Sequence, residues 1–181
     1  LEHREVDYWE IINENDPDDH GKLALLFQEL IQLVRPVGVK LGLFSYSLGV
    51  PEPEEWAMIR DNYQVLQIAR DEGHMISIHE YGYMDRDYPH IIGRFEWMYE
   101  ALKDILEGGL DVYVTEWNTE AGRPGLSRNT ETQWMSELKA YDALCQKYSW
   151  IKGVNLFTTG SVDAGNAWDF LDPARFGSLP L

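Results

Sequence analysis

The sequence predicts an α/β fold in which parallel strands alternate with helices, as in a (β/α)8 TIM barrel. Short runs rich in β-branched and aromatic residues recur along the 181 residues, and segments with helical spacing of apolar residues separate them. The alternation continues without a linker or a low-complexity segment. Polar residues gather where the strands end, which in a barrel is the mouth at which active sites lie.

An open doubly wound sheet is the alternative architecture for such an alternation. A dinucleotide-binding sheet of that kind has a glycine-rich turn after its first strand. The first strand here leads into NENDPDDHG instead, and no G-x-G-x-x-G pattern occurs in the sequence. The barrel is therefore the preferred interpretation.

Five strands are predicted, at residues 6–12, 39–46, 74–81, 111–117 and 151–158. The first of them, VDYWEII, is dense in aromatic and β-branched residues. A helix over 21–34 follows it, because apolar residues recur there at intervals of three and four. Asp18 or Asp19 is expected to cap that helix.

The next three strands are each followed by a predicted helix. One begins at Pro51 and Pro53, continues through an apolar stripe and stops at Gly73. Another covers about 90–107 and ends before two glycines. The last, over about 130–148, starts on a T-x-x-Q capping-box pattern.

Composition excludes several classes of partner. The formal net charge of −16 disfavours nucleic acid and anionic membrane surfaces, since both require a basic face. No apolar run is long enough to span a bilayer. The single cysteine, Cys145, cannot form an internal disulfide. The histidines lack zinc spacing and DPDDH lacks the spacing of an EF-hand, so neither a metal nor a cofactor is predicted.

The chain starts directly in its first strand. Leu1 precedes that strand by only a few residues, and no signal peptide is visible. We therefore expect residues 1–181 to form part of a barrel whose first three strands lie upstream. A secretion signal, if the protein is extracellular, would lie upstream as well.

Two of the predicted strands each lead to a glutamate at their carboxyl end. YWEIINEND reaches Asn13 and Glu14, and VYVTEWN reaches Glu116. In a barrel both side chains would meet at the same mouth. Two strands that each deliver a glutamate to one mouth indicate a pair of carboxyl groups that work together.

These motifs resemble those of the clan A retaining glycoside hydrolases. WEIINEN is similar to their fourth-strand motif W-E-I-W-N-E-P, and VYVTEWN is similar to the seventh-strand motif. HEY, at residues 79–81, resembles the His-x-Tyr on the sixth strand of family 5 members. The chain would then cover strands four to eight, and families 5, 39 and 128 are all conceivable relatives.

The resemblance implies a role for each site residue. Glu14 would be the general acid/base and Glu116 the nucleophile. Asn13 would bind the sugar 2-hydroxyl, while Tyr81 would donate a hydrogen bond that keeps Glu116 ionised. His79 would bind a sugar hydroxyl or orient a carboxylate. The stacking surfaces for sugar rings would be Trp117 and Trp168.

The resulting expectation is a retaining glycosidase acting on a β-linked oligo- or polysaccharide. A non-catalytic carbohydrate-binding barrel is the main alternative, although such proteins commonly lose one of the two glutamates. A third possibility is an unrelated open-sheet protein, in which Glu14 and Glu116 would lie far apart.

Overall fold

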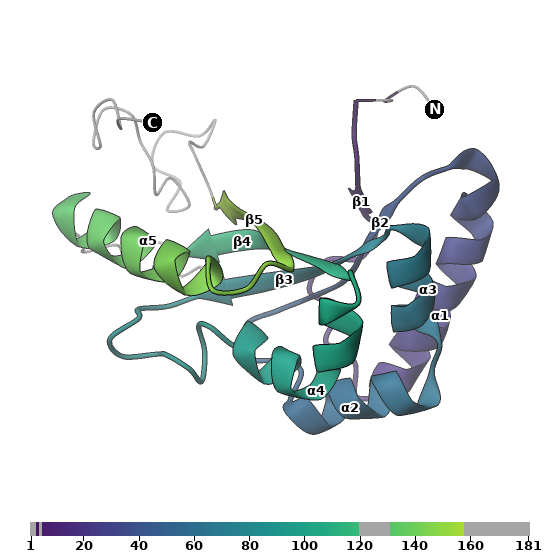
Figure 1. Cartoon of the computed structure of the whole chain (residues 1–181), viewed down its shortest axis with the longest axis horizontal. Helices are drawn as coiled ribbons and strands as arrows, with labels where there is room; N and C mark the ends of the chain where they lie inside the picture. Colours follow the sequence, from purple (N-terminus) through teal and green to yellow (C-terminus); the bar gives the residue numbers. More distant parts are fainter. Residues whose placement is uncertain (1–2, 4, 120–130, 158–181) are drawn as a thin grey trace.

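The computed structural model describes residues 3, 5–119 and 131–157, which contain one sheet of five parallel strands (Figure 1). The strands are β1 (Trp9–Glu10), β2 (Leu41–Tyr46), β3 (Met75–Tyr81), β4 (Asp111–Asn118) and β5 (Ile151–Leu156). Their spatial order is β1-β2-β3-β4-β5, and every neighbouring pair is parallel. This sequential order confirms the barrel architecture, because the order reverses within a doubly wound sheet.

Helices connect the strands over the convex face of the curled sheet (Figure 1). They are α1 (His20–Val34), the short 3-10 turn η1 (Arg35–Val37), α2 (Pro53–Asn62), α3 (Val65–Glu72), α4 (Phe95–Glu107) and α5 (Glu131–Cys145). Crossovers between parallel strands are right-handed, so sequential strand order brings successive helices to the same face. No helix among the described residues combines the length and the apolarity that crossing a bilayer requires.

The hydrophobic core lies between this helical layer and the sheet. Phe44 of β2 contacts Phe27 of α1 and Trp56 of α2 through its ring. Trp117 of β4 is fully buried and stacks on Tyr141 of α5. The opposite, concave face of the sheet is the side that lines the lumen in a barrel, and it carries mainly polar side chains.

A β-bulge in β4 decides which of its side chains reach the concave face. Val114 and Glu116 pair with two consecutive residues of β3, which leaves Thr115 without a partner in the ladder. The register against β5 shifts at the same place. Val112 and Val114 are buried towards the helices, and strict alternation would send Glu116 after them. The extra residue instead turns Glu116 to the concave face and Trp117 to the helices.

Several element boundaries differ from the sequence-based expectation. The first strand was predicted over 6–12, but only Trp9 and Glu10 pair with β2. β1 lies at the end of the sheet and pairs with β2 alone among the described residues. The rest of the predicted segment, on both sides of Trp9 and Glu10, forms no strand pairing there. The strand predicted over 151–158 ends at Leu156, and Thr158 lies outside the described residues.

The helix predicted from Pro53 to Gly73 is in fact two helices. Tyr63 adopts an extended conformation between α2 and α3, and its hydroxyl lies where a Cβ on Gly21 of α1 would be. The break therefore allows the tyrosine to pack against the start of α1. Other signals were read correctly, since Asp19 accepts a hydrogen bond from the Lys22 amide and Gly73 ends α3 with a left-handed φ of 71°.

The helix α4 begins at Phe95, later than the predicted residue 90. Its first residues are held by Glu80, a buried carboxyl group on β3. The Glu80 oxygens accept hydrogen bonds from the amides of Gly93 (2.7 Å) and Phe95 (3.1 Å) and from the Tyr141 hydroxyl (2.7 Å). These contacts join the strand to both α4 and α5. Burial raises the pKa of Glu80 to about 7, although the hydrogen bonds act in the opposite direction.

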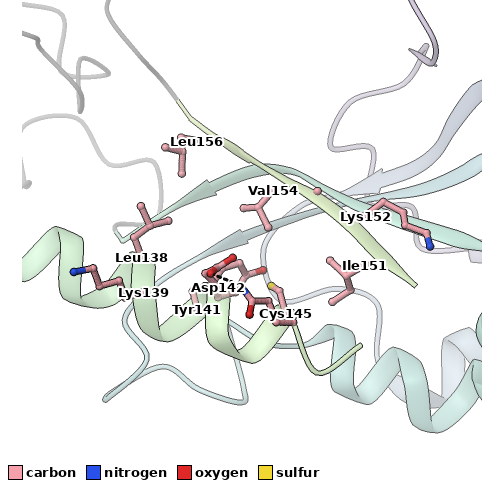
Figure 2. A pocket seen from close by; sticks show the side chains of 11 residues that line it. Leu138, Lys139, Tyr141, Asp142, Cys145, Ile151, Lys152, Val154 and Leu156 are labelled. Carbon is pink, nitrogen blue, oxygen red and sulfur yellow. Dashed lines mark hydrogen bonds between the residues drawn. The ribbon is translucent and has the colours of Figure 1, made fainter. Parts of the chain in front are cut away.

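The two outer strands of the sheet each leave one edge without a partner among the described residues. Beside β5, a hollow of about 510 Å³ opens between that strand and α5 (Figure 2). The apolar side chains that line it are Leu138, Tyr141, Cys145, Ile151, Val154 and Leu156. Near the other edge, α1 exposes Leu25, Leu26 and Leu33. Both edges therefore combine an unpaired strand with exposed apolar side chains, as expected of surfaces that further barrel elements would cover.

We predict that residues 1–181, expressed alone, self-associate. Unpaired strand edges and exposed apolar side chains both favour contacts between copies. Size-exclusion chromatography with light scattering over a range of concentrations should show species larger than a monomer. Replacing Leu26 and Leu33 with lysine should reduce this association. A chain that stays monomeric and melts cooperatively would mean that the two edges need no cover.

We also predict that Glu80 makes the folded chain less stable as the pH rises. The folded state retains this proton up to a pKa of about 7, while the unfolded carboxyl loses it near 4.5. Stability is therefore lost between these two values, by on the order of 1.4 kcal/mol for each pKa unit. Denaturant titrations from about pH 5 to about pH 8 should show a steeper decline in the free energy of unfolding for the wild type than for Glu80→Gln.

Glu100→Gln, at an exposed position of α4, is the matched control and should reproduce the wild-type decline. If Glu80→Gln and the wild type decline in parallel, Glu80 does not titrate in this window.

Candidate active site

The candidate site lies at the carboxyl ends of three strands. Glu14 follows β1, His79 and Tyr81 end β3, and Glu116 is near the end of β4. Because the strands are parallel and adjacent in order, these ends share one edge of the sheet. Residues that are far apart in sequence therefore meet on the concave face.

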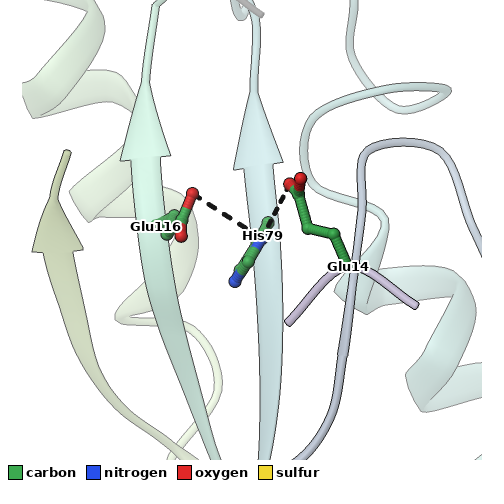
Figure 3. Close-up of side chains that lie close together, drawn as sticks. All are labelled: Glu14, His79 and Glu116. Carbon is green, nitrogen blue, oxygen red and sulfur yellow. Dashed lines mark hydrogen bonds and ion pairs between the residues drawn. The ribbon is translucent and has the colours of Figure 1, made fainter. Parts of the chain in front are cut away.

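The two glutamates lie on either side of the His79 ring (Figure 3). Nδ1 of His79 is 3.0 Å from Oε1 of Glu14 and 3.7 Å from Oε2 of Glu116. One oxygen of each glutamate and one ring nitrogen all lie within 4.8 Å of one another. The third interpretation, in which the two glutamates lie far apart in an unrelated fold, is therefore wrong.

Solvent reaches the two carboxylates unequally. The Glu14 side chain is 42% exposed and that of Glu116 is 18% exposed, whereas the His79 side chain is fully buried. Within the part of the chain that the structure describes, His79 is the one basic side chain at ion-pair distance from either glutamate. Nε2 of His79 is buried and has no hydrogen-bond partner among the same residues.

Tyr81 contributes a hydrogen bond to the more buried carboxylate. Its hydroxyl donates to Oε2 of Glu116, the same oxygen that faces His79. Burial raises the pKa of Tyr81 above its usual value, and the hydrogen bond to Glu116 and the negative charges of the two glutamates add to this. The hydroxyl therefore keeps its proton and acts as a donor to the carboxylate.

The backbone holds Glu14 in an uncommon conformation. Its φ is 49°, in the left-handed region that residues other than glycine rarely adopt. Its amide donates to the carbonyl of Ser45, 2.9 Å away. Ser45 is itself the extra residue of a bulge in β2 and has a φ of 42°. Non-glycine residues in such conformations often mark functional sites, where the surrounding structure holds them in place.

A second polar layer lies beneath the site on the concave face. Glu10 of β1 accepts hydrogen bonds from the hydroxyls of Ser45 (3.0 Å) and Ser77. The Ser77 hydroxyl also lies 2.5 Å from that of Thr115, the bulge residue of β4. This chain of hydroxyls crosses four strands and ties the bulge of β2 to the bulge of β4.

Sequence reasoning missed Ser77 and Thr115, two of the hydroxyl residues of this layer. Ser77 could have been found, since it precedes His79 by two positions and therefore shares its face of the strand. Thr115 could have been found as well, since it alternates with Val112 and Val114 along the strand and therefore faces the opposite side. Ser45 is a polar residue near a predicted strand end, but nothing in the sequence signals the bulge that turns it inward.

The other predicted site residues have different outcomes. Asn13 is exposed beside Glu14, and its binding role stays a prediction. Trp117 was wrongly predicted as a sugar-stacking surface, because the bulge turns it into the core against Tyr141 and Trp134. Trp168 lies outside the described residues. The side-chain oxygen of Asn118, at the end of β4, accepts a hydrogen bond from the Trp134 indole (3.1 Å). Asn118 thus helps to hold Trp134 against Trp117.

No protein-family model matches the chain, and no curated protein matches it either. Solved structures do match it in fold. One is XacCel5A, at a TM-score of 0.53 and 13% identity, with 87% of this chain and 51% of that one covered. Another is a triple mutant of the endo-β-1,4-glucanase from Xanthomonas axonopodis pv. citri, at a TM-score of 0.51 and 15% identity, covering 88% and 52%. XacCel5A in complex with cellopentaose matches at a TM-score of 0.43 and 15% identity, covering 86% and 64%.

The chain thus spans about half the length of the first two of these structures. At such low identity the likeness concerns the fold alone. The described residues have a fold like that of family 5 glycoside hydrolases, and they form a curled half-barrel of five parallel strands with flanking helices.

Proposed function

We propose that this chain is the catalytic half of a retaining glycoside hydrolase that cleaves a β-linked glycan. The observation that carries this proposal is the meeting of Glu14 and Glu116, from the two non-adjacent strands β1 and β4, around one ring nitrogen of His79. Facing oxygens within 4.8 Å of each other support the short separation of carboxyl groups, roughly 5–5.5 Å, that retention requires. Inversion needs a wider gap, roughly 6.5–9.5 Å, to admit a water molecule.

The surroundings of each carboxyl group suit a different task. Glu116 is the less exposed one and accepts the Tyr81 hydrogen bond, which holds its carboxylate in a fixed orientation, as suits a nucleophile. Glu14 is more open to solvent, as suits a group that protonates the leaving oxygen and later deprotonates a water molecule. His79, which contacts Glu14 and is fully buried, would hold that carboxyl in place.

The reaction would then proceed in two steps. Glu116 attacks the anomeric carbon while Glu14 gives its proton to the leaving glycosidic oxygen, and a covalent glycosyl-enzyme forms. Glu14, now ionised, takes a proton from a water molecule that attacks the same carbon, which frees Glu116. The two inversions of configuration yield overall retention.

A β-1,4-linked glucan is the first substrate to test. The matched glucanase is described as an endo-β-1,4-glucanase. This chain has a similar fold and presents a paired carboxyl site at the carboxyl ends of its strands. Asn13, next to Glu14, is the proposed contact for the sugar 2-hydroxyl. Trp168 stays the proposed stacking surface.

We predict that Glu116→Ala abolishes turnover of aryl β-glucosides and β-glucan by the complete protein, because no glycosyl-enzyme can form. Azide should restore part of the activity by entering the vacated space and attacking the sugar from that side. The product, identified by NMR, should be the glycosyl azide of inverted configuration. Asp61→Ala, at an exposed position on α2, is the control and should leave turnover unchanged.

Glu14→Ala should behave differently. Substrates with good leaving groups need little protonation, so their glycosylation step should suffer least, while deglycosylation slows without a base. Azide needs no base and should give a product of retained configuration. The opposite stereochemical pattern would reverse the two roles. Unchanged activity in both variants would refute a glycosidase at this site, and absent activity with intact sugar binding would favour the non-catalytic barrel.

We predict that Tyr81→Phe lowers kcat/KM by about 10- to 100-fold, because it removes a hydrogen bond to a charged acceptor that is worth about 1.5–3 kcal/mol. The matched control is Tyr88→Phe, which removes another tyrosine-to-glutamate hydrogen bond, to Glu96, at an exposed position. Steady-state kinetics of both variants gives the comparison. An equal effect of the two substitutions would deny Tyr81 a role at Glu116.

A further inference from the structure

The candidate site also has the donor set of a transition-metal site. Oε1 of Glu14, Nδ1 of His79 and Oε2 of Glu116 face a common point, with Nδ1 at 3.0 and 3.7 Å from the two oxygens. A metal ion that binds nitrogen and oxygen at roughly 2.0–2.2 Å places neighbouring ligands roughly 3–4 Å apart. The two separations from Nδ1 already have this spacing, and the two carboxylate oxygens lie within 4.8 Å of each other, so rotation of the glutamate side chains would complete the coordination.

The charge around these atoms favours a cation. Two carboxylates meet here, and the described residues provide no lysine or arginine within ion-pair distance of either one. The chain as a whole carries a net charge of −16, which raises the local concentration of cations. The buried His79 ring forms the wall of the site, and the exposed Glu14 leaves a path from solvent.

The ligand types narrow the choice of ion. One imidazole nitrogen and two carboxylate oxygens suit Zn²⁺ and Cu²⁺, whereas Mg²⁺ and Ca²⁺ prefer oxygen ligands alone. Three protein ligands would leave a position open for water. Nδ1 can bind a metal only when the ring proton is on Nε2, which has no acceptor among the described residues. We therefore expect weaker binding than at a structural zinc site, where that proton is hydrogen-bonded.

We propose that Glu14, His79 and Glu116 bind one divalent transition-metal ion, Zn²⁺ or Cu²⁺, and that this ion regulates the site by occupying it. The second half of this inference rests on the proposed function. A metal on both carboxylates removes the proton donor and the nucleophile together and excludes the sugar, so inhibition would be reversible and competitive. The hydrogen bond between His79 and Glu14 would be replaced by the metal contacts.

Isothermal titration calorimetry tests the binding without any need for activity. The full chain, stripped with EDTA and held in a buffer that does not chelate metals, is titrated with ZnCl₂ and separately with MgCl₂. We expect one Zn²⁺ per chain and no comparable binding of Mg²⁺. His79→Gln and Glu116→Gln should each weaken Zn²⁺ binding by at least the roughly 10- to 100-fold that loss of an outer-shell partner costs.

His90→Gln, which changes an exposed histidine, is the matched control and should retain wild-type binding. Circular dichroism identifies any ligand variant that fails to fold. Glu14→Gln, which changes the most exposed of the three ligands, then replaces that variant in the binding measurement. Zn²⁺ binding that is absent, or equal in the wild type and every folded ligand variant, would overturn the metal site. Zn²⁺ binding by the chain, together with a complete protein that shows no glycosidase activity, would uphold the site and refute only the proposed function. Activity unaffected by saturating Zn²⁺ would overturn the regulatory half.

Discussion

The site depends on one extra residue in β4. Strand alternation would place Glu116 in line with Val112 and Val114, which are buried against the helices. An ionised glutamate there would lie in the hydrophobic layer at a cost of several kcal/mol. Thr115, left out of the ladder on both sides, moves Glu116 to the concave face and gives its place in the core to Trp117. One extra residue thus supplies the site with a carboxylate and the core with a fully buried tryptophan.

The same logic explains how Glu14 reaches Glu116 from β1, with β2 and β3 lying between the two strands. β2 has a bulge at Ser45, whose carbonyl holds the amide of Glu14 in its left-handed conformation. That conformation directs the side chain across the sheet towards β3. His79 then occupies the gap between the two carboxylates, which it meets with a single nitrogen atom. The geometry is set by backbone irregularities on both sides and by one ring between them.

The sequence predicts the repetitive part of this structure well and the irregular part poorly. The five strands and their order follow from apolar patterns that repeat along the chain, and the ends of those strands correctly located Glu14, His79, Tyr81 and Glu116 on one edge. Bulges have no such pattern. The assumption that neighbours on a strand end share a site therefore assigned Trp117 to sugar binding, although Glu116 and Trp117 both follow the bulge and alternate to opposite faces of the sheet. The break at Tyr63 is similar, because it depends on a contact with Gly21 of a different helix.

β3 shows how the site and the fold share one strand. Its last three residues alternate, so that His79 and Tyr81 face the concave side while Glu80 faces the helices. Glu80 accepts hydrogen bonds from the start of α4 and from Tyr141 of α5, and Tyr141 in turn stacks on Trp117. Through these contacts, the helices that cover β3 and β4 also fix the relative position of the two strands. The distance between His79 and Glu116 is therefore maintained from the opposite face of the sheet, by groups that never touch the site.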